Sequence, residues 1–158
     1  MKHKGLSYWK KKADSEFSFW IRNSYNTKLG VQCYTCGRWY TVKTIQNGHF
    51  ISRGKNILRF SEINCKPQCV GCNVFKKGDL ITYRENLVKE YGEDKVKWLE
   101  VQRRTLKQWK WFELEEIYLK YKALNGLEIL SNSVMTPFPL GTIPLGRNKR
   151  ILNTLKGV

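Results

Sequence analysis

The sequence predicts an α+β fold, in which a small, partly extended core is preceded by one helix and followed by several others. Two observations support this prediction. Two Cys-x-x-Cys pairs, Cys33 with Cys36 and Cys69 with Cys72, enclose 32 residues. Before and after them, apolar side chains recur at the three- and four-residue spacing of a helix face. The expected order is a basic N-terminal helix (1–30), the core (31–78), a helical region (79–130) and a basic Pro- and Gly-containing tail or arm (131–158).

The first helix is expected between Tyr8 and about Asn23. Its apolar residues follow one helix face, whereas most of its lysines lie off that face. They are Trp9, Ala13, Phe17, Trp20 and Ile21. Residues 24–30 contain Asn and Gly and predict a loop.

Within the core, two short strands are expected over residues 31–34 and 37–42, joined by a tight turn. A further strand over 45–51 carries His49, the one histidine outside the N-terminal tail. Residues 52–60 predict a polar, basic loop, and a short helix is expected to begin after Cys69.

Three helices are expected after the core. The first carries a stripe of Leu80, Tyr83, Leu87 and Tyr91, with Gly92 as its stop signal. A second is expected from Glu93 to about Leu106. The third is expected from Phe112 or Glu113 to about Leu124, ended by Asn125 and Gly126.

Charge is the strongest compositional signal. Lysine and arginine number 29 against 13 aspartates and glutamates, which gives a net charge of +16. A solubility feature is the simpler explanation, but this surplus favours a polyanionic partner, and nucleic acid over a membrane surface. No apolar run approaches the ~18 residues of a membrane span. The N-terminus lacks an apolar secretion signal, so we expect a cytoplasmic protein with reduced thiols.

The four paired cysteines predict a structural zinc site. Cys33, Cys36, Cys69 and Cys72 supply four thiolates, which close a tetrahedral zinc site and leave no position for water. Cys65 has no partner at this spacing and is expected to be a buried free thiol.

His49 is the candidate general base. A lone histidine is more often a core or surface residue, but this one lies between the cysteine pairs, with basic residues after it. Hydrolysis of a phosphodiester needs a base and a cation, for which a neutral imidazole and a bound Mg²⁺ or Mn²⁺ are suited. The candidate phosphate contacts are Arg53, Lys55, Arg59, Lys76 and Lys77.

Three motifs together resemble a known family. Cys-x-x-Cys, then Gly-His-Phe-Ile-Ser-Arg, then Asn-x-x-Pro-Gln-Cys-x-x-Cys-Asn is similar to the NinG/Rap recombination nucleases of lambdoid phages, within the HNH or ββα-metal endonuclease class. The resemblance runs from about Tyr8 to Leu124. It implies a zinc-stapled ββα-metal (HNH-like) core with an N-terminal helix and C-terminal helices.

The resemblance also implies roles for single residues. His49 matches the general base, and Asn64 matches the asparagine that holds the catalytic loop. Asn73 is similar in position to an asparagine that binds the catalytic metal in phage endonuclease VII. Many HNH enzymes place Asp or His before the base as a metal ligand, whereas this chain has Gly48. The candidates for the missing ligand are Asn47, Asp79 and Glu62.

The implied activity is cleavage of branched DNA, such as Holliday junctions and D-loops, in the host bacterial cytoplasm. Symmetric junction cutting predicts a homodimer. Two alternatives remain open: a non-catalytic zinc-ribbon protein that binds DNA or RNA, and an HNH endonuclease that cuts a specific duplex sequence. The tryptophans near residues 98–111 suit a dimer interface or a wedge against bases, but also simple packing of the helices.

Overall fold

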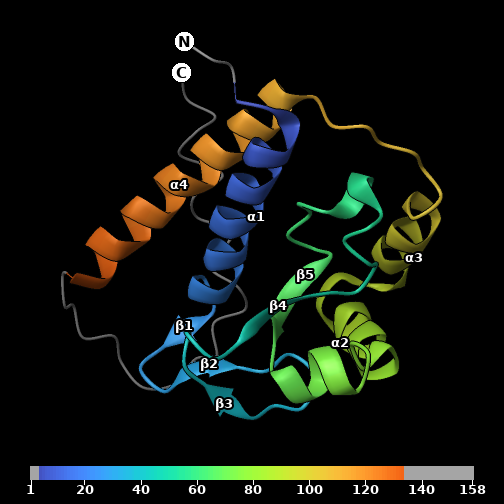
Figure 1. Ribbon diagram of the computed structural model, residues 1–158. Helices are drawn as coiled ribbons and strands as arrows, with labels where there is room; N and C mark the ends of the chain where they lie inside the picture. Colours follow the sequence, from blue (N-terminus) through green and yellow to red (C-terminus); the bar gives the residue numbers. More distant parts are fainter. Residues whose placement is uncertain (1–3, 134–158) are drawn as a thin grey trace.

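The computed structural model describes residues 4–133, and their side chains as far as residue 127. It is a mixed α+β fold with helices around two small sheets (Figure 1). The helices are α1 (Leu6–Asn23), α2 (Leu80–Tyr91), α3 (Glu93–Gln102) and α4 (Trp111–Ser133), with the short turns η1 (Asn56–Leu58) and η2 (Gly71–Phe75). The strands are β1 (Asn26–Thr27), β2 (Gly30–Gln32), β3 (Trp39–Tyr40), β4 (Gln46–His49) and β5 (Cys65–Gln68).

Both sheets are antiparallel and very small. The first has the order β1-β2-β3, and it includes a strand where the sequence predicted only a loop at residues 24–30. The second is the pair β4 and β5, in which His49 lies opposite Cys65. The chain between these two strands, residues 50–64, therefore leaves and returns at the same end of the pair.

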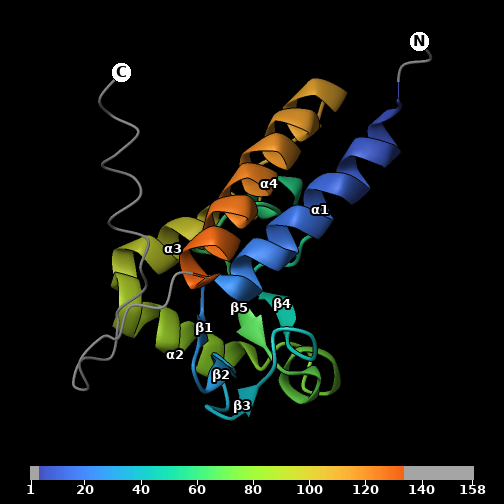
Figure 2. The same cartoon turned by 90° about the vertical axis from the view of Figure 1, so that its left-hand side faces the viewer.

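Helices α1 and α4 lie side by side and run in the same direction (Figures 1 and 2). Phe17 and Trp20 of α1 pack on Tyr121, with ring centroids 4.9 and 6.3 Å from it. Cys65 of β5 is buried in the same cluster, as expected for a free thiol. The amphipathic stripe predicted for the first helix is therefore its contact with α4 and β5.

The predicted end of the last helix at Asn125 and Gly126 was wrong. Helix α4 continues to Ser133, because the Asn125 side chain is buried against α1. Its Nδ2 donates to the backbone oxygen of Glu16 at 3.1 Å and to the Glu16 carboxylate at 2.8 Å. A tertiary contact thus replaces the capping role that the sequence suggested.

Helices α2 and α3 cover the loop that follows β4. Tyr83 and Leu87 of α2 and Leu99 of α3 are fully buried against Phe50. The bounds predicted for α2 are confirmed, whereas α3 ends at Gln102, before the predicted Leu106. The loop predicted over residues 52–60 contains the short turn η1.

A fully buried lysine ties the small core to α2. Lys66 Nζ lies 2.6 Å from the hydroxyls of Tyr25 and Tyr91 and 2.8 Å from the Glu90 carboxylate. Burial lowers the pKa of Lys66, and the Glu90 carboxylate opposes that shift. Three hydrogen-bonding partners satisfy the ammonium, which is the condition for burying a charge.

The predicted tail begins at residue 131, within the last turns of α4, and from residue 134 it lies outside the described residues. Among the helices that the structure describes, none is both long and apolar enough to cross a membrane.

Candidate functional site

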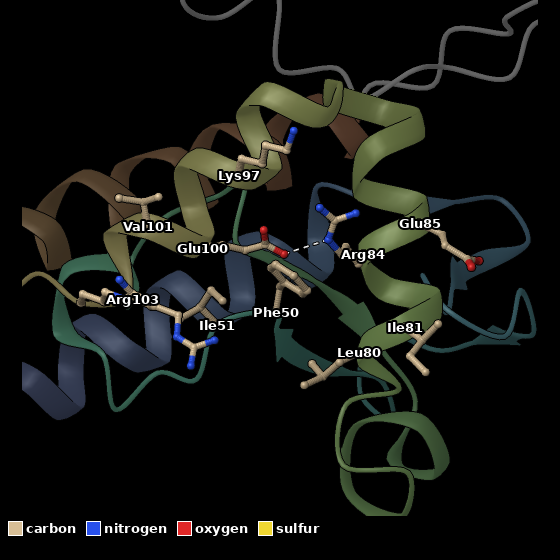
Figure 3. A pocket seen from close by; sticks show the side chains of 11 residues that line it. Phe50, Ile51, Leu80, Ile81, Arg84, Glu85, Lys97, Glu100, Val101 and Arg103 are labelled. Carbon is tan, nitrogen blue, oxygen red and sulfur yellow. Dashed lines mark hydrogen bonds and ion pairs between the residues drawn. The ribbon is translucent and has the colours of Figure 1, made fainter.

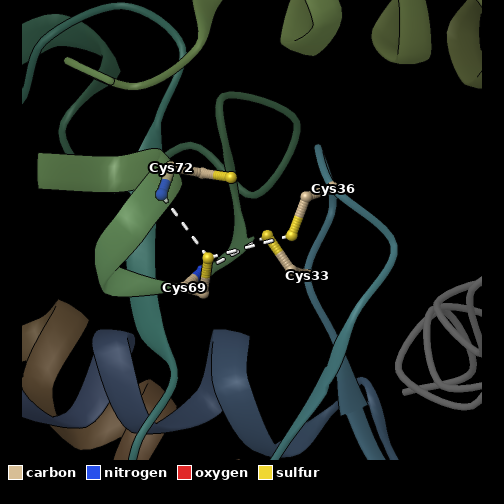
Figure 4. A group of neighbouring side chains, drawn as sticks. All are labelled: Cys33, Cys36, Cys69 and Cys72. Atoms are coloured by element: carbon tan, nitrogen blue, oxygen red, sulfur yellow. Dashed lines mark hydrogen bonds between the residues drawn. The ribbon is translucent and has the colours of Figure 1, made fainter. Parts of the chain in front are cut away.

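Four sulfur atoms converge beside the strands (Figure 4). The Sγ atoms of Cys33, Cys36, Cys69 and Cys72 all lie within 4.8 Å of one another. The first pair lies on the turn between β2 and β3. In the second pair, Cys69 directly follows β5 and Cys72 lies within η2. A tetrahedral zinc ion with Zn–S bonds of about 2.3 Å requires neighbouring sulfurs at roughly 3.8 Å. The separation of 3.9 Å between Cys36 and Cys69 fits that requirement.

The backbone around Cys33 favours the thiolate of that residue. Burial raises the pKa of the Cys33 thiol, but amides of Cys36 and Cys69 donate to its sulfur and bring the pKa down to about 6. Gly37 adopts a φ of 70°, which closes the turn after the first pair and which residues with a Cβ seldom adopt. The predicted ligand set therefore fits zinc in both donor type and spacing.

His49 ends β4, and its ring is oriented by the backbone. Its Nε2 lies 3.2 Å from the carbonyl oxygen of Arg59. A carbonyl only accepts hydrogen bonds, so this contact selects the neutral tautomer that carries its proton on Nε2 and leaves Nδ1 unprotonated. Burial lowers the pKa of His49, although the carbonyls of Arg59 and Asn47 oppose the shift. The neutral ring is therefore the form present at pH 7.

His49 lines a cavity of about 690 Å³ together with four other residues that the sequence predicted as site residues. They are Asn47, Asn73, Arg53 and Lys77. Two further cations, Arg22 of α1 and Lys43, were missed as site residues. Arg22 was recognisable only as a charge off the apolar face of the first helix, and Lys43 carried no local signal.

Two asparagines line this cavity, and their hydrogen bonding differs. Asn73 Nδ2 donates to Gln46 Oε1 at 2.7 Å, which turns the Asn73 Oδ1 away from that partner. Asn47 Oδ1 is buried and has no hydrogen-bond partner among the described residues. Amide oxygens are hard donors of the kind that Mg²⁺ accepts. The cavity could therefore hold such a cation, with phosphate and water completing its coordination.

Gly48 stands where many HNH enzymes have Asp or His, and the structure leaves no room for a side chain there. A Cβ at this position would lie 2.1 Å from Gln68 Oε1 and 2.8 Å from two other Gln68 atoms. Gln68 is fully buried and donates to the Gly78 carbonyl at 2.7 Å, so it cannot move aside freely. The neighbouring strand therefore leaves no room for a side chain at the position before His49.

Neither acidic candidate for the missing ligand lines the cavity. Asp79 accepts a hydrogen bond from Thr82 at 3.0 Å and pairs with Lys76 at 3.8 Å. Glu62 accepts a hydrogen bond from Tyr121 at 3.0 Å, on the side of α4. The described lining thus contains cations and amides but no carboxylate.

Asn64 holds the segment that follows His49. It is fully buried, and its Oδ1 accepts from the Ile51 amide at 2.8 Å. Its Nδ2 donates to the carbonyls of Ile51 at 2.9 Å and Leu58 at 3.2 Å. One side chain therefore closes the loop whose Arg59 carbonyl lies against His49, and Asn64 itself does not line the cavity.

The other predicted phosphate contacts lie elsewhere. Lys55 and Lys76 are exposed but do not line the cavity. Arg59 donates to both carboxylate oxygens of Asp14 in α1 and to the Arg53 carbonyl. A phosphate would have to displace Asp14 to reach Arg59, so Arg59 is occupied as an ion-pair partner and is not a proposed phosphate contact.

A second cavity, of about 890 Å³, lies between α2 and α3 (Figure 3). Phe50 and Ile51 form part of its lining, and Arg84 is held there by Glu93 at 2.6 Å and Glu100 at 2.8 Å. None of the residues predicted from sequence to act in the site lines this cavity. His49 and its neighbour Phe50 therefore face two different cavities.

Comparison with known proteins gives relatives from bacteriophages. Residues 1–128 match the family described as "Bacteriophage Lambda NinG protein". The chain is 30% identical over 130 residues to "Protein ninG" of Escherichia phage 933W, which covers 82% of this chain and 62% of that protein. It is 31% identical over 93 residues to "Protein ninG" of Escherichia phage lambda, which covers 59% of this chain and 44% of that protein.

The match with "Protein ninG" of Salmonella phage P22 is 32% over 89 residues, which covers 56% of this chain and 42% of that protein. The chain therefore spans less than two thirds of the length of these relatives. No solved structure gave a significant match. Because the family match extends over residues 1–128 of 158, the chain belongs to the NinG protein family of bacteriophages.

Proposed function

We propose that the chain is a metal-dependent DNA endonuclease of the HNH, or ββα-metal, class. The observation that supports this best is the placement of His49. Its Nε2 lies against the Arg59 carbonyl, and it lines a cavity together with cations and asparagines. Further support comes from the order β4, β5, η2, with His49 on the first strand and Asn73 on the helical turn, which is the order expected of a ββα unit.

In this mechanism His49 Nδ1 accepts a proton from a water molecule as the water attacks the scissile phosphorus. Arg53 and Lys77 line the same cavity and are placed to bind the nonbridging phosphate oxygens. Asn73 and Asn47 would hold a Mg²⁺ or Mn²⁺ ion. When bound, that ion neutralises charge that develops on the phosphate and on the leaving oxygen. Zinc would remain structural, because its four positions are all taken by sulfur.

A non-catalytic zinc-ribbon protein is the rival from another functional class. Both proposals expect zinc and nucleic-acid binding, so binding alone cannot separate them. The enzyme should nick DNA when Mg²⁺ or Mn²⁺ is added and stop when these ions are withdrawn, while its zinc content stays constant. Tight binding without any cleavage, at full zinc occupancy and with either metal, would favour the rival.

The proposed substrate is branched DNA, such as a four-way junction or D-loop. A broad cationic surface can read the shape and phosphates of a junction without contacts to base edges. The experiment compares nicking of a four-way junction with nicking of linear duplexes that contain each of its arm sequences. Faster cutting of the junction supports the proposal, whereas cutting at one sequence in both substrates would make the chain a sequence-specific HNH endonuclease.

A further inference from the structure

A polar strip of helix α1 runs from the loop after β4 to the candidate catalytic cavity. Its members recur at four-residue spacing, which places neighbouring members on the same side of a helix. They are Lys10, Asp14, Ser18 and Arg22. Lys10 Nζ lies 3.5 Å from Asn56 Oδ1 in that loop, whereas Ser18 and Arg22 line the cavity. Besides packing on α4, the first helix therefore touches both the loop and the site.

Asp14 holds the loop with two hydrogen bonds. Its carboxylate oxygens accept from Arg59 Nε at 2.8 Å and from Arg59 Nη2. A bidentate pair of this kind fixes the orientation of the guanidinium as well as attracting it. The side chains of Arg59 and Asp14 are 12% and 32% exposed, so water screens this pair less than a pair on the open surface.

Arg59 connects this restraint to two residues of the cavity. Its carbonyl oxygen lies 3.2 Å from His49 Nε2, and its Nη1 donates to the Arg53 carbonyl at 3.1 Å. His49 is the proposed base, and Arg53 is a proposed phosphate contact. Both residues therefore contact one arginine, whose side chain is held by Asp14.

Asp14 and Asn64 restrain the same loop in different ways. Asn64 closes the loop on itself, because its hydrogen bonds go to Ile51 and Leu58. Asp14 instead ties the loop to α1, the helix that supplies Arg22 to the cavity. The position of His49 relative to that cation therefore depends on the pair between Asp14 and Arg59.

We propose that Asp14 is a positioning residue for the nuclease reaction and that it acts through Arg59. It keeps the Arg59 carbonyl against His49 and the Arg53 backbone in place beside the phosphate. The inference rests on the proposed nuclease function, because it assigns Asp14 a part in orienting the base of that reaction. Asp14 itself does not line the cavity. The simpler alternative is an ion pair that contributes only to stability.

The first test needs no cleavage. The chain contains two histidines, so the zinc-loaded full chain labelled with ¹⁵N-histidine gives few ring signals to assign by NMR. A His49 Nε2 proton that is hydrogen-bonded to a carbonyl exchanges slowly with water and gives a ring N–H signal. Asp14→Asn has nearly the same shape but cannot accept both hydrogen bonds, so it should broaden or remove this signal. Arg59→Ala should do the same, although its backbone carbonyl remains.

Asp94→Asn is the matched control, because it removes the same charge from an exposed position on α3 that lines neither cavity. It should leave the His49 signal unchanged. Zinc content and thermal unfolding establish that each variant is folded, and Arg59→Ala repeats the test from the other side of the ion pair. A persistent His49 signal in folded Asp14→Asn would overturn the inference, as would its absence from the unmodified chain.

The second test separates chemistry from binding. Single-turnover nicking of a four-way junction by Asp14→Asn should slow by roughly tenfold or more, because a small misplacement of the base is costly. Junction affinity should stay the same or rise, since the variant loses a negative charge. Rate and affinity that fall together with stability would show a merely structural role and overturn the inference. Absence of nicking by the unmodified chain would count against the nuclease proposal, whereas the ring signal tests the link from Asp14 to His49 separately.

Discussion

Asn64 shows how one side chain can determine the shape of a site that it does not enter. It was predicted from the family resemblance, and the structure gives it three hydrogen bonds to the loop after β4. The sequence could not predict that closing this loop brings the Arg59 carbonyl against His49. That contact joins residues ten apart through a loop whose path depends on tertiary packing.

Replacing Asn64 by Ala should lower the free energy of unfolding by roughly 3 kcal/mol, because backbone groups of Ile51 and Leu58 lose their buried partners. Chemical denaturation monitored by circular dichroism measures the change. Asn26→Ala is the control, since Asn26 is exposed on β1 and should alter the stability by no more than about 0.5 kcal/mol. Equal effects from the two substitutions would contradict the role assigned to Asn64.

The contact between Gly48 and Gln68 gives a second prediction for single residues. Gly48→Ala should destabilise the protein by about 1–3 kcal/mol, because its Cβ would overlap the buried Gln68 side chain. In a Gln68→Ala background the same substitution should cost much less. The double-mutant cycle measures this coupling, and additive effects of the two changes would show that Gln68 is not the obstacle.

At the scale of elements, periodicity located the helices well and their ends less well. The stripe from Leu80 to Tyr91 was predicted at its observed bounds, because Gly92 is a strong stop signal. Asn125 and Gly126 carry a similar signal but lie within α4, because α1 supplies Asn125 with partners more than a hundred residues away. The local sequence therefore predicts that a helix forms, whereas tertiary contacts with other elements determine where that helix ends.

The zinc site was predictable for the opposite reason, because the spacing within each Cys-x-x-Cys pair and the thiolate chemistry can be recognised without tertiary contacts. Cys36→Ser should remove the metal and abolish cooperative folding of the strands, since a structural zinc site contributes folding free energy directly. Metal content by emission spectrometry and thermal unfolding measure this. Cys65→Ala is the matched control and should keep one zinc ion per chain, because Cys65 lies in the α1–α4 cluster. Loss of zinc from that control instead would contradict the assigned ligand set.

At the scale of the whole molecule, folding concentrates part of the positive charge around one cavity. The net charge of +16 indicated a polyanionic partner but not its location. Folding brings Arg22, Lys43, Arg53 and Lys77 from four separate segments to one cavity. Only Arg53 and Lys77 were predicted, because they lie near the cysteine and histidine motifs, and nothing local marks the other two.

These cations should make DNA binding strongly dependent on salt. The slope of log K against log salt should be about −3 or steeper, because the proposed site brings these four cations to the DNA phosphates. Arg53→Ala should reduce the slope by about 1, whereas Lys89→Ala, an exposed change away from both cavities, should leave it unchanged. Affinities measured by fluorescence anisotropy across a salt series test this. An unchanged slope for Arg53→Ala would place the DNA elsewhere.

The central claim is that the His49 imidazole accepts the proton of the attacking water. The measurement that tests it most directly is the single-turnover rate of Mg²⁺-dependent junction nicking by His49→Ala beside the unmodified chain. We expect that rate to fall by about 10²–10⁴-fold. Zinc content and junction affinity should remain as they were. Nicking by His49→Ala at the rate of the unmodified chain would contradict the account.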